Sequence, residues 1–332
     1  MREFRPLVSI IIPVYNGGNY LKDAIDSALS QTYSNIEVLV INDGSDDGGE
    51  TEKIAQSYGD KLLYFPKKNG GVATALNLGI ENMRGEYFSW LSHDDMYFPN
   101  KIDAQISLIK SLADKTEIVF AGFDVIDGER RQLNRVLPLE RYGRDKLETP
   151  LFALMHGMIN GCSLLIHKSH FERVGKFRED LPTTQDFDLW FRMMRHVPCR
   201  VCENALHMTR VHDLQGSRIY REEHREESDA LWINMMQSLT DEEKIQIGGS
   251  VKRFYGDIHF LLIRHTSNRA AIQYAGRQAI YKAGNFKIMS RIWFWLAYMM
   301  KWLREILRVL RRCSMTLTFA RVKYGTKKIF GY

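Results

Sequence analysis

Two adjacent aspartates, Asp94 and Asp95, directly follow an apolar run at 87–91. Such a run has the length of a buried strand, and open α/β folds bind their ligands beyond the ends of strands. Carboxylate oxygens are hard ligands that suit Mg²⁺ or Mn²⁺, and Mg²⁺ commonly shares its coordination sphere with substrate phosphates. The pair therefore indicates chemistry on a nucleotide diphosphate. Alternatively it forms a solvated turn after the strand, because aspartate favours turns.

The first two apolar runs of the chain also end in residues that could contact a ligand. The first run stops at a proline, in the segment Pro13, Val14, Tyr15 and Asn16. The second run, at 38–42, leads into Asp43. The carboxylate of Asp43 could accept hydrogen bonds from a pyrimidine N–H or a ribose hydroxyl. Alternatively Asp43 lies in a turn or caps the helix expected after it.

Two glycines, Gly70 and Gly71, precede a helical pattern. Glycine lets the backbone approach a ligand closely, and the N-terminus of a helix attracts phosphate. The pair lacks the Lys-Ser/Thr ending of a P-loop and the spacing of a dinucleotide-binding fingerprint. A plain turn explains these glycines equally well.

Two later motifs combine carboxylates, an arginine and a histidine. Asp186 opens a helical pattern and could act as a general base, although it or Asp188 could instead cap that helix. Further along the chain, His212 follows Arg210 by two residues. A neutral imidazole is a good ligand for Mn²⁺, and a guanidinium neutralises phosphate oxygens. A purely structural histidine is the alternative.

Six motifs, in this order and at these spacings, resemble those of the family 2 glycosyltransferases of the GT-A fold. They lie at 8–16, 38–47, 69–77, 92–95, 184–190 and 210–213. The resemblance extends from residue 7 to about 218. It implies an inverting enzyme of the bacterial polysaccharide type, which moves a sugar from a UDP- or dTDP-sugar to a hydroxyl of a glycan or lipid-linked glycan. It also implies Mn²⁺ or Mg²⁺ as cofactor.

The resemblance further assigns roles to individual residues. The implied catalytic base is Asp186, and the implied metal ligands are Asp94, Asp95 and His212. Contacts to the nucleotide sugar are implied for residues at four strand ends and at the glycine pair. These residues are Pro13, Val14, Tyr15, Asn16, Asp43, Gly71, Ser92, Asp94 and Arg210.

At two positions the chain departs from the common family pattern. Asp-x-Asp-Asp is replaced by Ser-His-Asp-Asp at 92–95, and Glu-Asp is replaced by Gln-Asp at 185–186. A serine hydroxyl can still hydrogen-bond a ribose but supplies no charge. The glutamine removes a neighbouring charge, so that Asp186 should ionise more easily. The alternative to an active enzyme is a catalytically degenerate, membrane-associated module that binds sugar nucleotides.

Strand and helix patterns alternate through the first 200 residues. Strands are expected at 7–13, 36–41, 61–65, 86–91 and 118–122, and helices at 19–31, 47–58, 71–83 and from 99 onward. Repeated strand–helix units predict an α/β fold with a mostly parallel, Rossmann-like sheet that helices cover on both faces. The polar segment 127–150 is typical of a loop excursion, the run 158–166 of a strand, and the segment 186–194 of a helix start.

After about residue 220 the pattern becomes purely helical. Helices are expected at 221–238, 241–264, 268–283 and 288–312. The resemblance implies that residues 1–220 form the GT-A catalytic domain, and the change of pattern predicts a helical C-terminal region at 221–332.

The basic charge of the chain is concentrated at its end. Residues 291–332 carry ten Lys or Arg and one acid, a net charge of +9 in a chain whose net charge is +6. The helix expected at 288–312 has an apolar stripe, a basic face and aromatic residues near its start, which is typical of a helix on an anionic membrane surface. A packed helix or an oligomer contact is the alternative. Apart from charge, no motif indicates nucleic-acid binding.

The sequence also bears on compartment and on a rival enzyme class. Four scattered cysteines do not make a disulfide framework, and neither a signal peptide nor a clear transmembrane stretch is evident. We therefore expect a cytoplasmic protein, peripheral at the inner face of the cell membrane.

A rival enzyme class is the sugar-nucleotide pyrophosphorylases. These enzymes typically have a Gly-rich loop with Thr-Arg after the first strand, whereas this chain has Pro-Val-Tyr-Asn at 13–16, which argues against that class.

Overall fold

The computed structural model describes residues 4–213, 215, 221–265, 268–282 and 299. The chain divides into two compact units, Met1–Ser250 and Val251–Tyr332. Helices α11 (Arg221–Ser238) and α12 (Asp241–Gly248) therefore belong with the first unit. The sequence prediction grouped them with the C-terminal region, because a change to purely helical patterning does not reveal which helices pack on the sheet domain.

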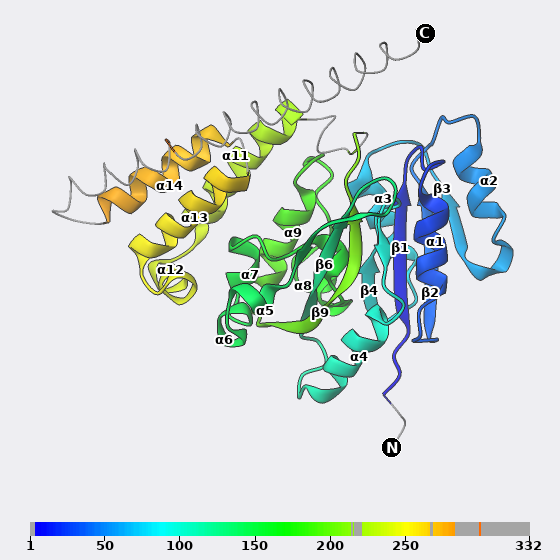
Figure 1. The fold of residues 1–332 in the computed structure, drawn as a ribbon, viewed down its shortest axis with the longest axis horizontal. Coiled ribbons are helices and arrows are strands. Elements are labelled where there is room, and N and C mark those ends of the chain that lie inside the picture. The colour runs from blue at the N-terminus through cyan, green and yellow to red at the C-terminus, as the bar shows by residue number, and fades with distance from the viewer. Residues whose placement is uncertain (1–3, 214, 216–220, 266–267, 283–298, 300–332) are drawn as a thin grey trace, which may run out of the picture. The chain divides into compact units, whose positions relative to one another are not determined.

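The first sheet has five strands in the order β3-β2-β1-β4-β8 (Figure 1). Their bounds are Val8–Val14 (β1), Ile36–Asn42 (β2), Leu63–Pro66 (β3), Tyr87–Trp90 (β4) and Ile166–His167 (β8). β1 is parallel to β2 and β4, and β2 is parallel to β3, whereas β8 is antiparallel to β4. The sheet is thus mostly parallel, as predicted, and the carboxyl ends of its parallel strands meet at one edge.

Helices cover both faces of this sheet. α1 (Leu21–Leu29) packs its apolar stripe into the same core cluster as Ile10 of β1. Ile11 points to the opposite face, because successive strand residues alternate in direction. There, a Cβ on Gly79 of α3 (Val72–Asn82) would lie 2.5 Å from Ile11 Cγ2, so glycine lets this helix approach the strand. Figure 1 shows both helices beside β1.

A second sheet of four strands, in the order β5-β9-β6-β7, continues the first unit. Their bounds are Met96–Tyr97 (β5), Ile118–Ile126 (β6), Gln132–Val136 (β7) and Cys199–Arg210 (β9). β9 is parallel to β6 and antiparallel to β5, with Met96 opposite Met208. This pairing brings residues 92–95, here called the carboxylate loop, to the end of the long strand β9.

Five further helices of the first unit agree with or add to the predicted pattern. They are Glu50–Gln56 (α2), Lys101–Ser111 (α4), Phe152–Met155 (α7), Ser169–Val174 (α8) and Gln185–Met194 (α9).

Two segments differ from the sequence prediction. The expected loop at 127–150 contains β7 and two short helices, α5 (Pro138–Arg141) and α6 (Arg144–Leu147). β7 escaped prediction because four of its five residues are exposed, which leaves no alternation of apolar and polar residues. The run 158–166 bends through a 3₁₀ turn after Asn160, whose side chain accepts the Cys162 N–H at 2.9 Å.

The second unit contains α13 (Val251–His265) and α14 (Arg269–Tyr281). The single helix expected at 241–264 is interrupted at Gly249, whose φ of +77° ends α12. The basic helix expected at 288–312 lies outside the described residues except for Met299. Within the described part of the chain, no helix combines the length and apolar character needed to cross a membrane.

Candidate functional site

A carboxylate and an imidazole from distant parts of the chain meet beyond the ends of β4 and β9. His212 Nε2 lies 2.9 Å from Asp94 Oδ2, and both side chains are 14% exposed. The ring of Tyr20 packs 5.1 Å from the His212 ring. Burial alone would raise the pKa of Asp94, but the hydrogen bond with His212 and the nearby His93 hold this pKa below its ordinary value. The site therefore presents an ionised carboxylate beside an imidazole nitrogen.

Asp95 turns the other way, into the protein, and is 4% exposed. Its carboxylate accepts hydrogen bonds from the Thr209 hydroxyl at 3.0 and 3.1 Å and from the Arg210 backbone N–H at 2.8 Å. Burial and the adjacent Asp94 raise the pKa of Asp95 to about 8. The residue that the sequence predicted as a metal ligand thus fastens the carboxylate loop to β9.

Arg210, the last residue of β9, has a side chain that is 1% exposed. Its Nε donates to the Asp94 carbonyl at 2.8 Å, Nη1 to the Gly128 carbonyl at 3.1 Å, and Nη2 pairs with Asp23 Oδ2 at 3.0 Å. The guanidinium also lies 4.3 Å from the centroid of the Tyr20 ring. The sequence predicted a donor contact for Arg210, whereas here its nitrogens are occupied by protein atoms around the carboxylate loop.

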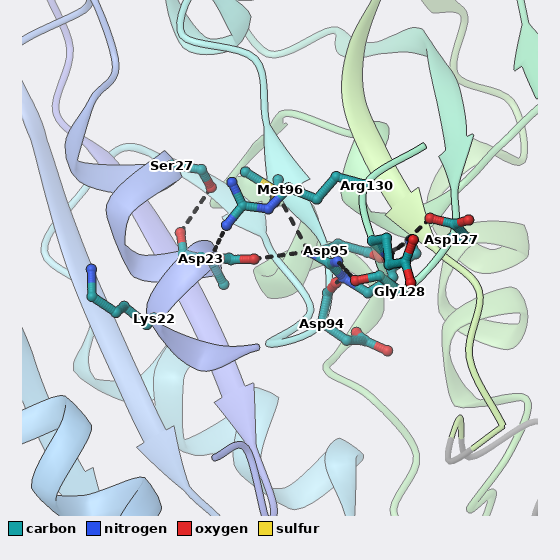
Figure 2. A network of polar contacts seen from close by, with 12 residues as sticks. Lys22, Asp23, Ser27, Asp94, Asp95, Met96, Asp127, Gly128 and Arg130 are labelled. Atoms are coloured by element: carbon teal, nitrogen blue, oxygen red, sulfur yellow. Dashed lines mark hydrogen bonds and ion pairs between the residues drawn. The ribbon is translucent and has the colours of Figure 1, made fainter. Parts of the chain in front are cut away.

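Asp23 and Tyr20 are the residues of this site that sequence reasoning missed. Asp23 lies in the first turn of α1 and pairs with Arg130 as well as with Arg210. Figure 2 shows Arg130 reaching Asp23, while Asp94 extends its carboxylate away from this cluster. An acidic residue in the first turn of a helix is ordinary, so nothing in the sequence marks Asp23.

Asp43, at the end of β2, is 3% exposed. Its carboxylate accepts the backbone N–H of Gly70 at 3.0 Å and that of Gly71 at 2.7 Å, and it pairs with Lys67. Gly71 has a φ of +89°, which glycine adopts without strain. Asp43, the expected nucleotide contact, is therefore hydrogen-bonded directly to the expected turn at Gly70 and Gly71, and it orders that turn.

The segment that follows β1 lies at the same edge. The Asp43 N–H donates to the Val14 carbonyl at 2.8 Å, next to Pro13. Tyr15 is 43% exposed and donates its hydroxyl to Asp46 at 3.2 Å. Asn16, with a φ of +53°, also donates to Asp46, at 2.7 Å. The exposed tyrosine ring is thus presented at the edge where β1 and β2 end.

Ser92 opens the carboxylate loop. Its backbone N–H lies 3.4 Å from Cys162 Sγ, and its hydroxyl lies 3.5 Å from the same sulfur. The serine that replaces an acidic residue of the family pattern thus has a neutral neighbour.

The two aspartates of α9 have different surroundings. Asp186 Oδ1 accepts the Phe187 backbone N–H at 2.8 Å, and burial raises the pKa of this carboxyl group. Asp188 instead pairs with Arg192 at 2.7 Å, and Arg192 also donates to the Val174 carbonyl at 2.6 Å. Asp188 is therefore committed to a structural ion pair, which leaves Asp186 as the carboxylate available for proton transfer.

The donor set around Asp94 fits a divalent cation of the Mn²⁺ or Mg²⁺ type. It offers one carboxylate oxygen and one imidazole nitrogen, and such ions commonly complete their coordination with phosphate oxygens and water. Among the residues that the structure describes, no group of three or more His, Cys, Asp or Glu could hold a metal ion. Asp94 and His212 alone would therefore make only a partial set of ligands for such an ion.

Comparison with known proteins gives a family match. Residues 9–175 match the model of the family described as Glycosyl transferase family 2. An uncharacterized glycosyltransferase of Rickettsia typhi is 51% identical over 255 residues, which cover 77% of this chain and 79% of that protein. An uncharacterized glycosyltransferase of Rickettsia felis is 48% identical over 274 residues, which cover 82% of this chain but 45% of that protein. The chain thus spans about half the length of the latter relative.

Two solved structures share the fold at low sequence identity. A mannosyltransferase from Pyrobaculum calidifontis, in complex with GDP-Man and Mn²⁺, has 18% identity and a TM-score of 0.58, with 98% of this chain and 89% of that chain covered. Residues 1–349 of S. aureus TarS, in complex with UDP, have 14% identity and a TM-score of 0.54, with 84% and 92% covered. These likenesses concern the fold, and they confirm the predicted GT-A arrangement.

Proposed function

Because the chain belongs to glycosyl transferase family 2, we propose that it moves a sugar from a nucleotide-diphosphate sugar to an acceptor hydroxyl, with inversion at the anomeric carbon. The observation that carries the proposal is the 2.9 Å contact between Asp94 and His212. This pair lies beyond β4, which neighbours β1 in the sheet. The pair and the segment around Asp43 are thus at the ends of β4 and β2, the two strands that flank β1, where open α/β sheets bind nucleotides.

The donor proposed for this edge is a UDP- or dTDP-sugar. Its base and ribose would lie against Tyr15 and the turn that Asp43 orders at Gly71. Its diphosphate would lie near Asp94 and His212, which would hold Mn²⁺ or Mg²⁺. The complexes of the neighbouring folds with UDP and with GDP-Man and Mn²⁺ support a nucleotide sugar and a divalent ion in a fold of this kind.

The residues of the chain would divide the reaction between them. Asp186 takes the proton of the acceptor hydroxyl while that oxygen attacks the anomeric carbon and the bond to the diphosphate breaks. Arg210 and Asp95 hold the carboxylate loop in place. When bound, the metal ion offsets the negative charge that develops on the leaving diphosphate.

We propose a glycan or lipid-linked glycan as acceptor, in the synthesis of a surface polysaccharide. The basic segment 291–332, with its net charge of +9, supports attachment to an anionic membrane surface. This attachment would place the enzyme at the inner face of the cell membrane.

A screen of UDP- and dTDP-hexoses with and without MnCl₂ tests the proposed function. We expect one UDP- or dTDP-hexose to raise the melting temperature of the protein only in the presence of MnCl₂. The same sugar nucleotide should release its nucleoside diphosphate on incubation with the protein, with water taking the place of the acceptor hydroxyl. Absence of both effects across the panel would contradict the proposal.

A further inference from the structure

We propose that Glu227 of α11 is a positioning residue for the candidate base Asp186, so that α11 forms part of the catalytic unit. This inference rests on the proposed function, in which Asp186 takes the acceptor proton. Glu227 lies beyond residues 9–175, the segment that matches the family model. It lies in a charged helix whose sequence is typical of a solvated surface.

The carboxylate of Glu227 holds the turn that leads into α9. Its Oε1 accepts the backbone N–H of Thr184 at 2.7 Å, that of Thr183 at 3.1 Å, and the hydroxyl of Thr184 at 2.6 Å. Three donors on two consecutive residues thus converge on one oxygen. Hydrogen bonds to a charged acceptor are stronger than those between neutral groups.

This arrangement replaces the usual local cap of a helix. The residue before a helix commonly turns its side-chain oxygen toward the first free N–H groups. Thr184 holds that position before α9, but its side chain makes no capping hydrogen bond. Its hydroxyl donates to Glu227 instead. The start of α9 is therefore fixed from a different helix, and loss of Glu227 would free it.

Asp186 is the second residue of the helix that this turn starts. Its Oδ1 accepts the Phe187 N–H at 2.8 Å, so the direction of the carboxylate follows the first turn of α9. A shift of the turn at Thr184 therefore moves the base as well. Displacement of a reacting group by about 1 Å can cost on the order of a hundredfold in rate.

Apolar packing supports the same contact. The rings of Phe187 in α9 and Trp232 in α11 lie 6.2 Å apart, and Trp232 is 6% exposed. Ser228, the neighbour of Glu227 in the chain, is also 6% exposed. Ser228 and Trp232 lie one turn apart on the packed face of α11, and Glu227, which is half-buried, lies at the edge of that face. Exclusion of water strengthens the hydrogen bonds at the turn.

Glu227 also places a negative charge near the base. Burial raises the pKa of Asp186, the Phe187 N–H of α9 and His224 of α11 oppose this rise, and Glu227 adds to it. Replacement of Glu227 by Gln keeps an acceptor oxygen for the turn but removes the charge, whereas replacement by Ala removes both. The two variants therefore separate positioning from charge.

The test compares Glu227→Ala, Glu227→Gln and Glu226→Gln in the full chain. Glu226 is an exposed neighbour on the same helix and provides the matched control. Turnover is followed as release of UDP or dTDP from the UDP- and dTDP-hexose panel, over pH 5 to 9. UDP binding is measured with MnCl₂, and amide hydrogen exchange is measured at Thr183 and Thr184.

We expect Glu227→Ala to lower kcat by at least about tenfold while KM for the donor stays within about twofold, because the base moves but the donor site does not. Glu227→Gln should retain most of kcat and shift the acidic limb of the kcat profile to lower pH. Exchange at Thr184 should be faster in Glu227→Ala, and Glu226→Gln should match wild type in every measurement.

Several results would overturn the inference. If Asp186→Asn is inactive but Glu227→Ala keeps the wild-type kcat and pH profile, Glu227 does not position the base. The proposed function would not be affected by that result. Active Asp186→Asn would overturn the assignment of the base, and the positioning role with it. If Glu227→Ala does not fold, an unshifted pH profile in Glu227→Gln would overturn the inference. If no sugar nucleotide is turned over by wild type, unchanged exchange at Thr184 in Glu227→Ala would overturn it.

Discussion

Asp94 Oδ2 and His212 Nε2 lie 2.9 Å apart although 118 residues separate them in the chain. Hydrogen bonds between side chains and backbone assemble this pair. Asp95 accepts the Arg210 N–H at 2.8 Å, and Arg210 Nε donates to the Asp94 carbonyl at 2.8 Å. These two hydrogen bonds hold the end of β9 against the carboxylate loop, next to the contact between Asp94 and His212. Such support preorganises Asp94 and His212 as ligands, because the fold already holds the two side chains close together.

We expect Asp94→Ala and His212→Ala each to remove the gain in UDP affinity that Mn²⁺ provides, because each variant lacks one protein ligand. The loss should exceed about tenfold in Kd, or about 1.4 kcal/mol. Calorimetric titration of UDP with and without MnCl₂ checks this, with the exposed residue Asp60 replaced by Ala as control. If both variants keep the gain, these residues are not the metal ligands.

Replacement of Arg210 by Lys tests whether this residue acts on the donor or on the protein. Lysine lacks the planar fork that reaches Asp23, Gly128 and the Asp94 carbonyl together. Disruption of this buried network should lower the free energy of unfolding by about 3 kcal/mol in urea denaturation. Unchanged stability combined with weakened UDP binding would instead establish the donor contact that the sequence predicted.

Asp95 should make stability depend on pH in a defined direction. Its pKa is about 8 in the folded protein and about 4 in an unfolded chain. The protonated carboxyl group therefore favours folding. This contribution is full below about pH 4 and is lost as the pH rises through 8. Asn at this position is neutral at every pH, so the stability of Asp95→Asn relative to wild type should increase from pH 4 to pH 9.

Melting temperatures of wild type and Asp95→Asn in EDTA across this range measure the effect. Asp60→Asn, an exposed substitution, serves as control. Parallel curves for wild type and Asp95→Asn would show that Asp95 does not carry a raised pKa.

Asp186→Asn should lower turnover by at least about a hundredfold, because amide nitrogen and oxygen cannot take the acceptor proton. UDP binding should stay within about twofold, since Asp186 contacts no candidate donor residue in the proposed scheme. The matched control is Asp188→Asn, which breaks the ion pair with Arg192 and should reduce stability more than turnover. Near wild-type turnover in Asp186→Asn would exclude it as the base.

Much of the fold follows from local patterns in the chain. β1 and β2 are continuous apolar runs in the sequence, and the apolar residues of α1 recur at helical spacing. These local patterns are sufficient to identify the three elements. β7 could not be found this way, since its residues are held by pairing with β6 and not by burial. The break at Gly249 was missed because glycine inside a helical pattern is often tolerated.

The site was predictable in its residue types but not in its contacts. The motifs around Asp94, Asp186 and His212 are visible in sequence, and the structure brings Asp94 and His212 together. The inward orientation of Asp95 and the burial of Arg210 were not visible, because they depend on the pairing of β5 with β9. Asp23 and Glu227 act through residues far away in the chain, so no local pattern identifies them.

The segment 291–332, which apart from Met299 lies outside the described residues, carries the prediction about membranes. Its net charge of +9 and the apolar stripe expected at 288–312 should bind anionic lipid. Deletion of 291–332 should therefore release the protein from vesicles that contain phosphatidylserine. Binding of the full chain should weaken with added salt, because exposed charges are screened over roughly 8 Å at physiological ionic strength.

Co-sedimentation of the full and truncated chains with these vesicles, at low and high salt, measures this effect. Neutral vesicles of phosphatidylcholine provide the control, and they should bind the full chain less because they lack the opposing charge. Turnover of a short soluble acceptor should survive the deletion better than turnover of a lipid-linked one, since the catalytic residues all lie in the first unit. Equal sedimentation of the two chains would contradict the membrane prediction and favour a packing or oligomer role for this segment.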